Sequence, residues 1–462
     1  MRSTASTRYE ARCKPWGGRG ARTWDICRRG DLVVLNYSVV LFADTDDITA
    51  GAGRSVYGIS LLERHLRVFA SLGARRVTVV GPAPGRGSEI RADGYDERWF
   101  AELRGVDCVG ADESPARWLP GKDEVVLVLD AHHLYDPRVL RAMVEGGPNR
   151  RAADPAVRES CRLLVADADL LASLTACWSG SESLWSSLES APESTCPVFD
   201  LREMDPYIVD LRRSLPPWWV VLDSDRKASR AEALLIDAAQ KGTLDFPAEF
   251  IHPPLENLLT KWISAGTATP NQVTTLTILL AFLATGLLAV GQSGPGYTAA
   301  GLIIAFIVGV LDGVDGKLAR VTVRCTRFGD RYEHVLDVIW ELTWYWALGW
   351  MLGGSGDAAG PFVLATVITL FYLLDKAATG MFKSRQGIEL FDYEPMDRFF
   401  RRIGARRNTN VLLLLGGTAA GMLAEAFTFV AIWTVITAAF HWTRAIWVPS
   451  KPTSAGDVER LP

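Results

Sequence analysis

The chain has 462 residues, too many for one ordinary domain, so we expect two or three. Its 49 basic and 53 acidic side chains give a net charge of −4, which offers no indication of nucleic-acid binding. The 16 tryptophans and the positive mean hydropathy of +0.11 are typical of a partly membrane-embedded protein. The seven cysteines form no C-x-x-C pair. No histidine accompanies them at zinc-site spacing, so they indicate scattered thiols of a reducing compartment and disfavour a disulfide framework or a zinc site.

Residues 1–30 are rich in arginine, glycine and serine. They contain no apolar core long enough for a signal peptide, so we expect a disordered basic tail in the cytosol. Residues 449–462 are expected to form a second, C-terminal tail.

Residues 31–242 have the pattern of a soluble α/β domain. Short β-branched apolar runs alternate with amphipathic stretches, as in a doubly wound parallel sheet. The runs that predict buried parallel strands are 33–35 with 39–42, 77–80, 125–129, 163–165 and 218–222. The stretches that predict helices are 59–72, 136–145 and 229–241, and we expect 85–97 and 179–193 to be surface insertions.

Parts of this domain resemble the sugar-nucleotidyltransferase (cytidylyltransferase-like) fold. The resemblance lies in residues 56–64 (VYGISLLER), 73–80 (GARRVTVV) and 129–137 (LDAHHLYDP). A working member would need a glycine-rich phosphate loop with a following lysine, a metal-binding aspartate after the central strand and a second aspartate near the end of the domain.

These requirements are met only in part. The nearest match to the phosphate loop is residues 50–54 (AGAGR), which is one residue short, and no lysine occurs in 31–121. His132 stands where the family has its first aspartate, whereas Asp223 is a fair candidate for the second. We therefore predict a degenerate nucleotidyltransferase-like domain without turnover; an unrelated α/β domain remains the alternative. His132 and His133 are not expected to share a metal ion, because adjacent residues on an extended segment point apart.

Residues 243–270 are predicted to bridge this domain to a membrane part. After Pro253-Pro254 an amphipathic pattern follows, and it suits a helix lying at the membrane interface. Its apolar positions are Leu255, Leu258, Leu259, Trp262 and Ile263.

Residues 271–448 contain six apolar runs, which predict an all-α domain of six transmembrane helices. The runs are 273–290, 298–311, 335–352, 361–374, 411–423 and 426–448. The last two are separated only by Ala424-Glu425, and we expect a hairpin with Glu425 at its turn. The connections 291–297 and 353–360 carry no lysine or arginine, whereas 312–334 and 375–410 carry many. The positive-inside rule therefore places the latter two, the N-terminal domain and both termini on the cytoplasmic side of the cell (inner) membrane.

Between the second and third runs lies the most informative stretch, 312–337 (DGVDGKLARVTVRCTRFGDRYEHVLD). Ionisable groups so close to a membrane are costly unless they serve a site. On helices, Asp312 and Asp315 share one face, and Glu333 and Asp337 share another. Four carboxylates aimed at one point would suit hard cations such as Mg²⁺ or Mn²⁺.

This stretch resembles the signature of the CDP-alcohol phosphatidyltransferases, D-G-x2-A-R-x8-G-x3-D-x3-D with a further aspartate three residues earlier. The positions in register are Asp312, Asp315, Gly316, Ala319, Arg320, Gly329 and Asp337, with the eight-residue spacer intact. Glu333 departs from the pattern, because the family has aspartate there, and its extra methylene puts full activity in doubt. Upstream, residues 269–274 (TPNQVT) resemble the entry to the family's first spanning helix, which lines the nucleotide site.

The resemblance implies a metal-assisted transfer from a CDP-activated lipid or alcohol to a polar alcohol, with release of CMP, in phospholipid biosynthesis. Two Mg²⁺ or Mn²⁺ ions would be held by Asp312, Asp315, Glu333 and Asp337, and Asp337 would be the general base. The nucleotide would be bound by Gly313, Gly316, Ala319, Arg320, Gly329, Asn271 and Thr274. Basic residues that could bind an acidic acceptor such as an inositol phosphate are Lys376, Lys383, Arg385 and Arg398.

Two alternatives stay open. A bifunctional enzyme would make CDP-inositol in its N-terminal domain and then a di-inositol phosphate. A non-catalytic membrane scaffold would keep the fold without the activity. The family suggests a homodimer, and the sequence does not report it.

Overall fold

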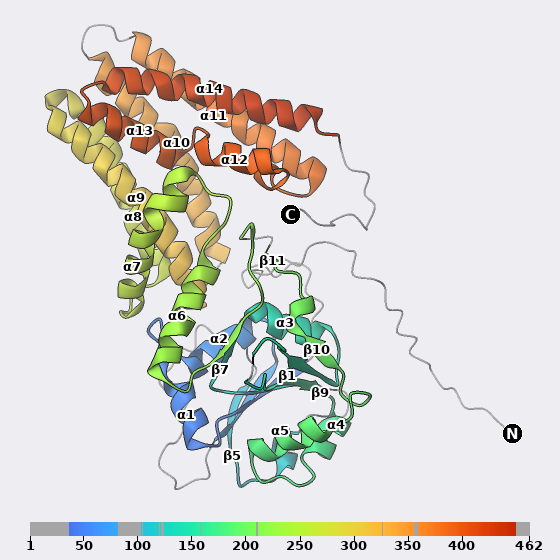
Figure 1. The fold of residues 1–462 in the computed structure, drawn as a ribbon. Coiled ribbons are helices and arrows are strands. Elements are labelled where there is room, and N and C mark those ends of the chain that lie inside the picture. The colour runs from blue at the N-terminus through green and yellow to red at the C-terminus, as the bar shows by residue number, and fades with distance from the viewer. Residues whose placement is uncertain are drawn as a thin grey trace.

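The computed structural model describes residues 37–81, 103, 105–119, 121, 124–157, 159–208, 211–325, 327–354 and 359–449, and of 327–337 the backbone only. The predicted tail 1–30, the insertion 85–97 and residues 450–462 lie outside the described residues. Two parts are visible in Figure 1: a sheet domain at the N-terminal side and a bundle of long helices formed by the C-terminal half.

The N-terminal part is built on a seven-stranded sheet in the order β10-β8-β9-β6-β1-β4-β5. Strands β1, β4, β5 and β6 run parallel, as expected for a doubly wound sheet, but β9 is antiparallel to both β6 and β8. The sheet strands are β1 (Tyr37–Phe42), β4 (Arg76–Gly81), β5 (Gly105–Gly110), β6 (Val125–Asp130), β8 (Arg150–Ala153), β9 (Leu163–Ala166) and β10 (Val198–Asp200). Short pairs are formed by β2 (Ser55–Val56) with β3 (Ile59–Ser60), β7 (His133–Tyr135) with β13 (Trp219–Val221) and β11 (Tyr207–Ile208) with β12 (Arg213–Ser214).

Three expectations about this domain are wrong. The run at 163–165 forms a strand, but it is not parallel to β6, because a fully buried strand has the same apolar pattern in either direction. The run at 218–222 lies outside the main sheet, in β13. The segment 179–193 is not a surface insertion: it contains helix α5 (Ser181–Ser190), whose Leu184, Trp185 and Leu188 are buried in the core.

The other helices of this part surround the sheet (Figure 1). They are α1 (Asp46–Gly53), α2 (Leu61–Ser71), α3 (Pro137–Glu145), α4 (Ala168–Leu174) and α6 (Asp225–Ala239). Helices α2, α3 and α6 were predicted by the amphipathic stretches, with boundaries that differ by a few residues. Asp136, Ser60 and Ser224 lie at their N-terminal ends and accept backbone hydrogen bonds there, which explains where each helix begins.

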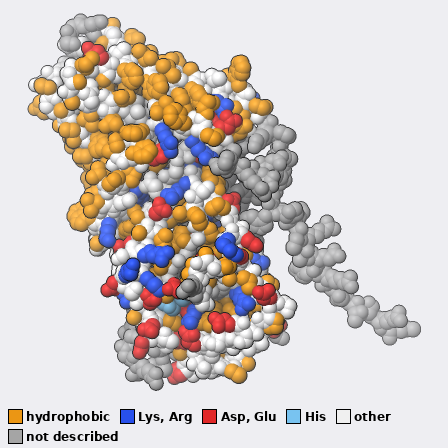
Figure 2. All heavy atoms as spheres, viewed as in Figure 1, with side chains coloured by type: hydrophobic (Ala, Val, Ile, Leu, Met, Phe, Trp, Pro, Cys, Tyr) orange, Lys and Arg blue, Asp and Glu red, His pale blue; other side chains and the backbone are white. Residues whose placement is uncertain are grey.

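Each of the six apolar runs of the C-terminal part lies wholly or mostly in a helix, although the fifth run, 411–423, extends into a turn. The helices are α8 (Pro270–Ala289), α9 (Pro295–Val321), α10 (Arg327–Gly353), α11 (Ala359–Gln386), α13 (Arg407–Ala419) and α14 (Leu423–Trp447), with the short α12 (Pro395–Ile403) before α13. Among the described residues, α8, α9, α11 and α14 are long and apolar enough to cross a membrane. Apolar side chains cover this part of the surface in Figure 2, so the chain is a membrane protein. The count of six transmembrane helices stays a prediction, because α13 has only 13 residues.

The hairpin between the last two runs is confirmed, but its turn is formed by residues 420–422 and Glu425 lies in the first turn of α14. Helix α14 packs along α11 as well as α13.

The bridge between the two parts is helix α7 (His252–Ser264), preceded by a short π-helical turn at Pro247–Ile251. Its polar face is turned inward: His252, Glu256, Thr260 and Ser264 are buried, and the helix packs against α9. Its apolar face is turned outward, with Trp262 75% exposed and Leu258 67% exposed. This inverted arrangement suits a helix that rests on a membrane surface, as the sequence predicts.

The sheet domain contacts the C-terminal end of α9 directly. Arg64 and Arg67, both buried on α2, donate hydrogen bonds to the backbone carbonyls of Val321 and Thr322, the latter at 2.7 Å. The last carbonyls of a helix have no partner within the helix, so these guanidinium groups satisfy them and complement the helix dipole. The end of the predicted catalytic helix is therefore fixed by the N-terminal domain.

Candidate active site

The start of α8 is determined by a local sequence signal. Thr269 caps the helix, its side chain and that of Gln272 form a reciprocal capping box, and Pro270 occupies the first helical position. This fixed start places Thr274 one turn into the helix, facing α9. The Thr274 hydroxyl donates a hydrogen bond of 2.6 Å to Oδ2 of Asp315. Two predicted site residues, far apart in sequence, are thus brought together.

Asp315 is the central acidic residue of the site. It is only 3% exposed, and its Oδ1 has no hydrogen-bond partner among the described residues. A buried carboxylate oxygen without a partner is costly. The second oxygen is already oriented by Thr274, so the free one fits a metal ligand, and a hard divalent cation would supply the missing partner.

Asp312 lies one turn earlier on the same helix. Its Oδ2 accepts a hydrogen bond of 2.7 Å from Nη2 of Arg407, at the start of α13, and the Asp312 side chain is 26% exposed. The Arg407 guanidinium also lies 4.9 Å from the ring of Trp340. Sequence reasoning counted Arg407 only as a charge that sets membrane orientation, because nothing local indicates that α13 begins next to α9.

Two motif glycines have close protein neighbours. A Cβ at Gly313 would collide with the Glu256 carboxylate of α7, and a Cβ at Gly316 would lie 3.1 Å from Nη2 of Arg320. Gly313 therefore admits a carboxylate from the bridging helix, and the binding of the nucleotide by both glycines stays a prediction.

Glu256 is itself part of a buried ion pair that the sequence did not indicate. Its Oε2 lies 2.8 Å from Nζ of Lys317, and the same nitrogen donates a hydrogen bond of 2.6 Å to Oδ1 of Asn257. Burial raises the pKa of Glu256 above its ordinary value, which Lys317 partly offsets. The pair fastens α7 to the middle of the motif.

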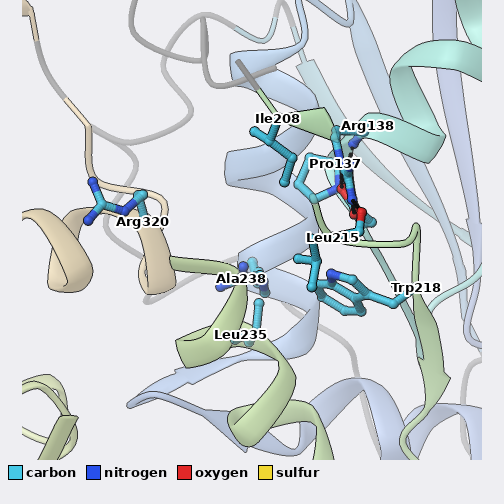
Figure 3. A pocket seen from close by; sticks show the side chains of 10 residues that line it. Pro137, Arg138, Ile208, Leu215, Trp218, Leu235, Ala238 and Arg320 are labelled. Atoms are coloured by element: carbon cyan, nitrogen blue, oxygen red, sulfur yellow. Dashed lines mark hydrogen bonds and ion pairs between the residues drawn. The ribbon is translucent and has the colours of Figure 1, made fainter. Parts of the chain in front are cut away.

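Arg320 does not point freely into a nucleotide site. Its Nε donates a hydrogen bond of 2.9 Å to the carbonyl of Ala239, at the end of α6. Beside it lies a cavity of about 10 Å³ between the two parts of the chain, lined also by Arg64, Arg138 and Trp218 (Figure 3). That volume admits about one water molecule, so the cavity is no substrate site.

The structure says less about the other residues predicted to bind the nucleotide or the metal. Ala319 and Asn271 are half-buried, and the described contacts of both are backbone hydrogen bonds: the Ala319 carbonyl accepts from the amide of Arg324, and the Asn271 carbonyl from the Thr275 hydroxyl. The side chains of Glu333 and Asp337, and the surroundings of Gly329, lie outside the described residues, although all three positions are within α10.

Of the residues predicted to bind an acceptor, Lys376, Lys383 and Arg385 lie in the C-terminal half of α11 and Arg398 lies in α12. Lys383 pairs with Glu389 at 2.6 Å, Arg385 donates to the carbonyl of Ala445 at 2.9 Å, and Arg398 donates to the carbonyl of Asp392 at 3.5 Å. Nζ of Lys376 lies 5.4 Å from the ring of Tyr372. Each of the four side chains thus has a protein contact of its own, and their role in acceptor binding stays a prediction.

A different basic pair is gathered there. The guanidinium carbons of Arg401 and Arg406 lie 4.5 and 4.7 Å from the ring of Phe391. Arg406 is 3.7 Å from the buried Asp375, which is also hydrogen-bonded to His441. Burial and the neighbouring Arg406 lower the pKa of Arg401 to about 9. Among the described residues, Nε of Arg401 and Nη2 of Arg406 have no hydrogen-bond partner. Two adjacent guanidinium groups with unused donors are suited to an anionic ligand.

The N-terminal domain does not form the phosphate loop considered above. Residues 50–53 belong to α1, and Arg54 donates hydrogen bonds to Asp225 and to the carbonyl of Asp223. Asp223 in turn pairs with Lys227 at 2.7 Å, and this hydrogen bond lowers the pKa of Asp223. The groups that would have handled a triphosphate are thus bonded to one another.

Residues 267–447 match the family model of CDP-alcohol phosphatidyltransferase. Two curated relatives, from Aquifex aeolicus (strain VF5) and Thermococcus kodakarensis, are each named bifunctional IPC transferase and DIPP synthase. They are 28% identical over 220 residues (47% of this chain, 48% of the relative) and 29% identical over 122 residues (26% of each). The chain therefore matches about half the length of the first relative and a quarter of the second.

Two crystal structures of Mycobacterium tuberculosis phosphatidylinositol phosphate synthase, one with CDP-DAG bound and one in complex with manganese and citrate, were also matched. Both are 17% identical, with TM-scores of 0.33 and 0.32. They cover 46% and 45% of this chain, and 98% and 92% of their own. At these TM-scores the likeness carries no argument about this chain.

Proposed function

Because residues 267–447 match the family model of CDP-alcohol phosphatidyltransferase, we propose that this membrane protein transfers a phosphatidyl or phosphoalcohol group from a CDP-activated donor to an alcohol acceptor, releasing CMP in phospholipid biosynthesis. The observation that supports it best is Asp315: a buried carboxylate with one oxygen oriented by Thr274 and the other without a partner among the described residues. Such a carboxylate is prepared for a cation.

The residues that would hold the metal are Asp312 and Asp315 on α9 and Glu333 and Asp337 on α10, with Mg²⁺ or Mn²⁺ as the cofactor and two ions as the expected number. When bound, the metal neutralises the charge of the donor's pyrophosphate and of the leaving CMP. Arg407 would hold Asp312 in place in the absence of the ion and limit the repulsion between the carboxylates.

Asp337 would accept the proton of the acceptor hydroxyl. The acceptor oxygen then forms a bond to the phosphorus that carries the lipid or alcohol, and the bond from that phosphorus to the oxygen of CMP breaks. Asn271, Thr274, Ala319, Arg320 and the motif glycines would shape the nucleotide side of the site. Of these, Thr274 also orients Asp315.

For the acceptor we propose an anionic alcohol such as an inositol phosphate. The supporting observation is the pair Arg401 and Arg406 beside Phe391, whose unused donors match a phosphate group. Lys376, Lys383, Arg385 and Arg398 stay predicted acceptor residues. The site, the N-terminal domain and both termini would face the cytoplasm, where CDP-linked substrates are found. A homodimer remains the expectation drawn from the family.

The bifunctional alternative is kept, because both curated relatives are named as bifunctional proteins. Two observations argue against a cytidylyltransferase activity of the N-terminal domain. Residues 50–53 are helical, and Arg54, Asp223 and Lys227 pair with one another. Turnover of CTP by the full chain in the presence of inositol phosphate would favour the bifunctional enzyme.

The test is CMP release by membranes that contain the full chain, supplied with CDP-diacylglycerol and a panel of polar alcohols, with and without Mg²⁺ or Mn²⁺. We expect metal-dependent release that Asp312→Asn and Asp337→Asn abolish. The matched control is Glu425→Gln, which changes an exposed acid in the first turn of α14 and should leave release unchanged. A folded protein that releases no CMP with any acceptor would contradict the proposal and favour the scaffold.

A further inference from the structure

A second group of side chains that could ligate a metal lies in the N-terminal domain. Asp130 is the last residue of β6 and His133 the first of β7, with His132 in the turn between them. One ligand atom from each of the three residues lies within 4.8 Å of the other two. All three are buried, at 0%, 9% and 3% exposed.

This arrangement corrects the expectation that the two histidines point apart. That expectation assumes an extended segment, but the chain turns at Ala131 and His132 before β7 begins. The two rings come to lie 4.5 Å apart, nearly perpendicular to each other. The turn therefore brings both imidazoles to the same side, at the carboxyl end of β6.

Both imidazoles are incompletely hydrogen-bonded. Nδ1 of His132 and Nδ1 of His133 are buried and have no hydrogen-bond partner among the described residues. The other ring nitrogen of His133 lies 3.4 Å from the carbonyl of Ser160, the arrangement by which proteins orient a metal-binding histidine. The ring of His133 also stacks with that of Trp219, at 5.7 Å.

Asp130 is held from outside the group. Its Oδ1 accepts a hydrogen bond of 2.8 Å from Nε1 of Trp185, and its Oδ2 accepts one of 2.9 Å from Arg162. Each carboxylate oxygen has two acceptor positions, so both retain capacity for a metal ion. Arg162 is itself bound by both oxygens of Glu182, at 2.5 and 2.9 Å. Its charge is therefore countered by Glu182.

The wider surroundings are negative. Besides Arg162, the charged groups that act on His132 are Asp223, Asp47 and Glu182. Three carboxylates against one guanidinium favour a cation at the centre of this group.

We propose that Asp130, His132 and His133 bind a divalent transition-metal ion such as Zn²⁺, separate from the Mg²⁺ or Mn²⁺ site of the membrane part. Two imidazole nitrogens and one carboxylate oxygen are a donor set that favours Zn²⁺, Co²⁺ or Ni²⁺ over Mg²⁺. Three protein ligands leave a further coordination position for water or an oxygen ligand. The inference does not rest on the proposed transferase activity.

The experiment uses the purified full chain in detergent, stripped of metal with a chelator and then equilibrated with Zn²⁺ in the presence of excess Mg²⁺. Bound zinc is counted by mass spectrometry, and its ligands are identified by X-ray absorption, in which imidazole gives a characteristic scattering pattern. We expect one zinc ion per chain with imidazole ligands, and its loss in His132→Asn and in His133→Asn.

Two controls locate the ion. The double variant Asp312→Asn with Asp315→Asn removes only carboxylates of the membrane site and should keep the imidazole-bound zinc. His252→Gln removes a histidine of the bridging helix and should also keep it. Folding of each variant is verified by size exclusion and tryptophan fluorescence. The proposal is overturned if the folded wild-type chain retains no zinc, or if the zinc persists in both His132→Asn and His133→Asn.

Discussion

Replacement of Thr274 by valine tests the metal site through a residue that is not itself expected to bind the metal. The change removes a hydroxyl that donates a hydrogen bond of 2.6 Å to Asp315 and keeps the shape of the side chain nearly unchanged. A hydrogen bond to a charged group contributes about 1.5–3 kcal/mol. Loss of an outer partner of a metal ligand typically lowers metal affinity or activity by about 10- to 100-fold.

We therefore expect Thr274→Val to raise the Mg²⁺ or Mn²⁺ concentration needed for half-maximal CMP release by about 10- to 100-fold. The maximal rate at saturating metal should fall less, since Asp315 itself remains. The assay is a metal titration of CMP release at fixed donor and acceptor concentrations.

The chain offers a closely matched control. Thr277 is on the same helix and is also buried, but among the described residues its hydroxyl donates only to the carbonyl of Val273 within the helix. Thr277→Val should leave the metal titration unchanged. If Thr274→Val gave the wild-type titration in a folded protein, the argument that Asp315 is a metal ligand oriented by Thr274 would be refuted.

Three further predictions concern the contacts around the site. Glu256→Gln leaves the buried Lys317 without its carboxylate and should lower the free energy of unfolding by about 3–5 kcal/mol. In thermal unfolding in detergent, adding Lys317→Met should recover most of this loss. Losses that simply add in the double variant would show that the two side chains do not interact. Arg67→Met leaves the terminal carbonyl of Thr322 unsatisfied and should expose the junction of the two parts to limited proteolysis, which an unchanged digestion pattern would contradict. Burial lowers the pKa of His252, so the unfolded chain binds its proton more readily; the stability that His252 contributes is present above pH 6.5 and is lost as the pH falls below it. The unfolding temperature of His252→Gln should accordingly depend less on pH between 5 and 7 than that of the wild type, and identical pH profiles would argue against it.

Much of this protein could be predicted from sequence because the signals are local. The spacing of Asp312, Asp315, Gly316, Ala319 and Arg320 is visible in one stretch of chain. The apolar runs of the membrane part are long enough to be identified one by one, and a helix start such as Thr269-Pro270 is determined by residues within one turn.

The tertiary structure decided which distant groups meet. Arg407 reaches Asp312 only because α13 begins beside α9, and Glu256 fills the space at Gly313 only because α7 packs there. The direction of β9 was likewise undetermined, because a strand buried on both faces has no pattern that distinguishes parallel from antiparallel pairing. A turn after Asp130 likewise placed two histidines side by side. Periodicity reports the environment of one segment at a time. The pairing of charges across segments depends on how the segments pack, and that was settled only when the chain folded.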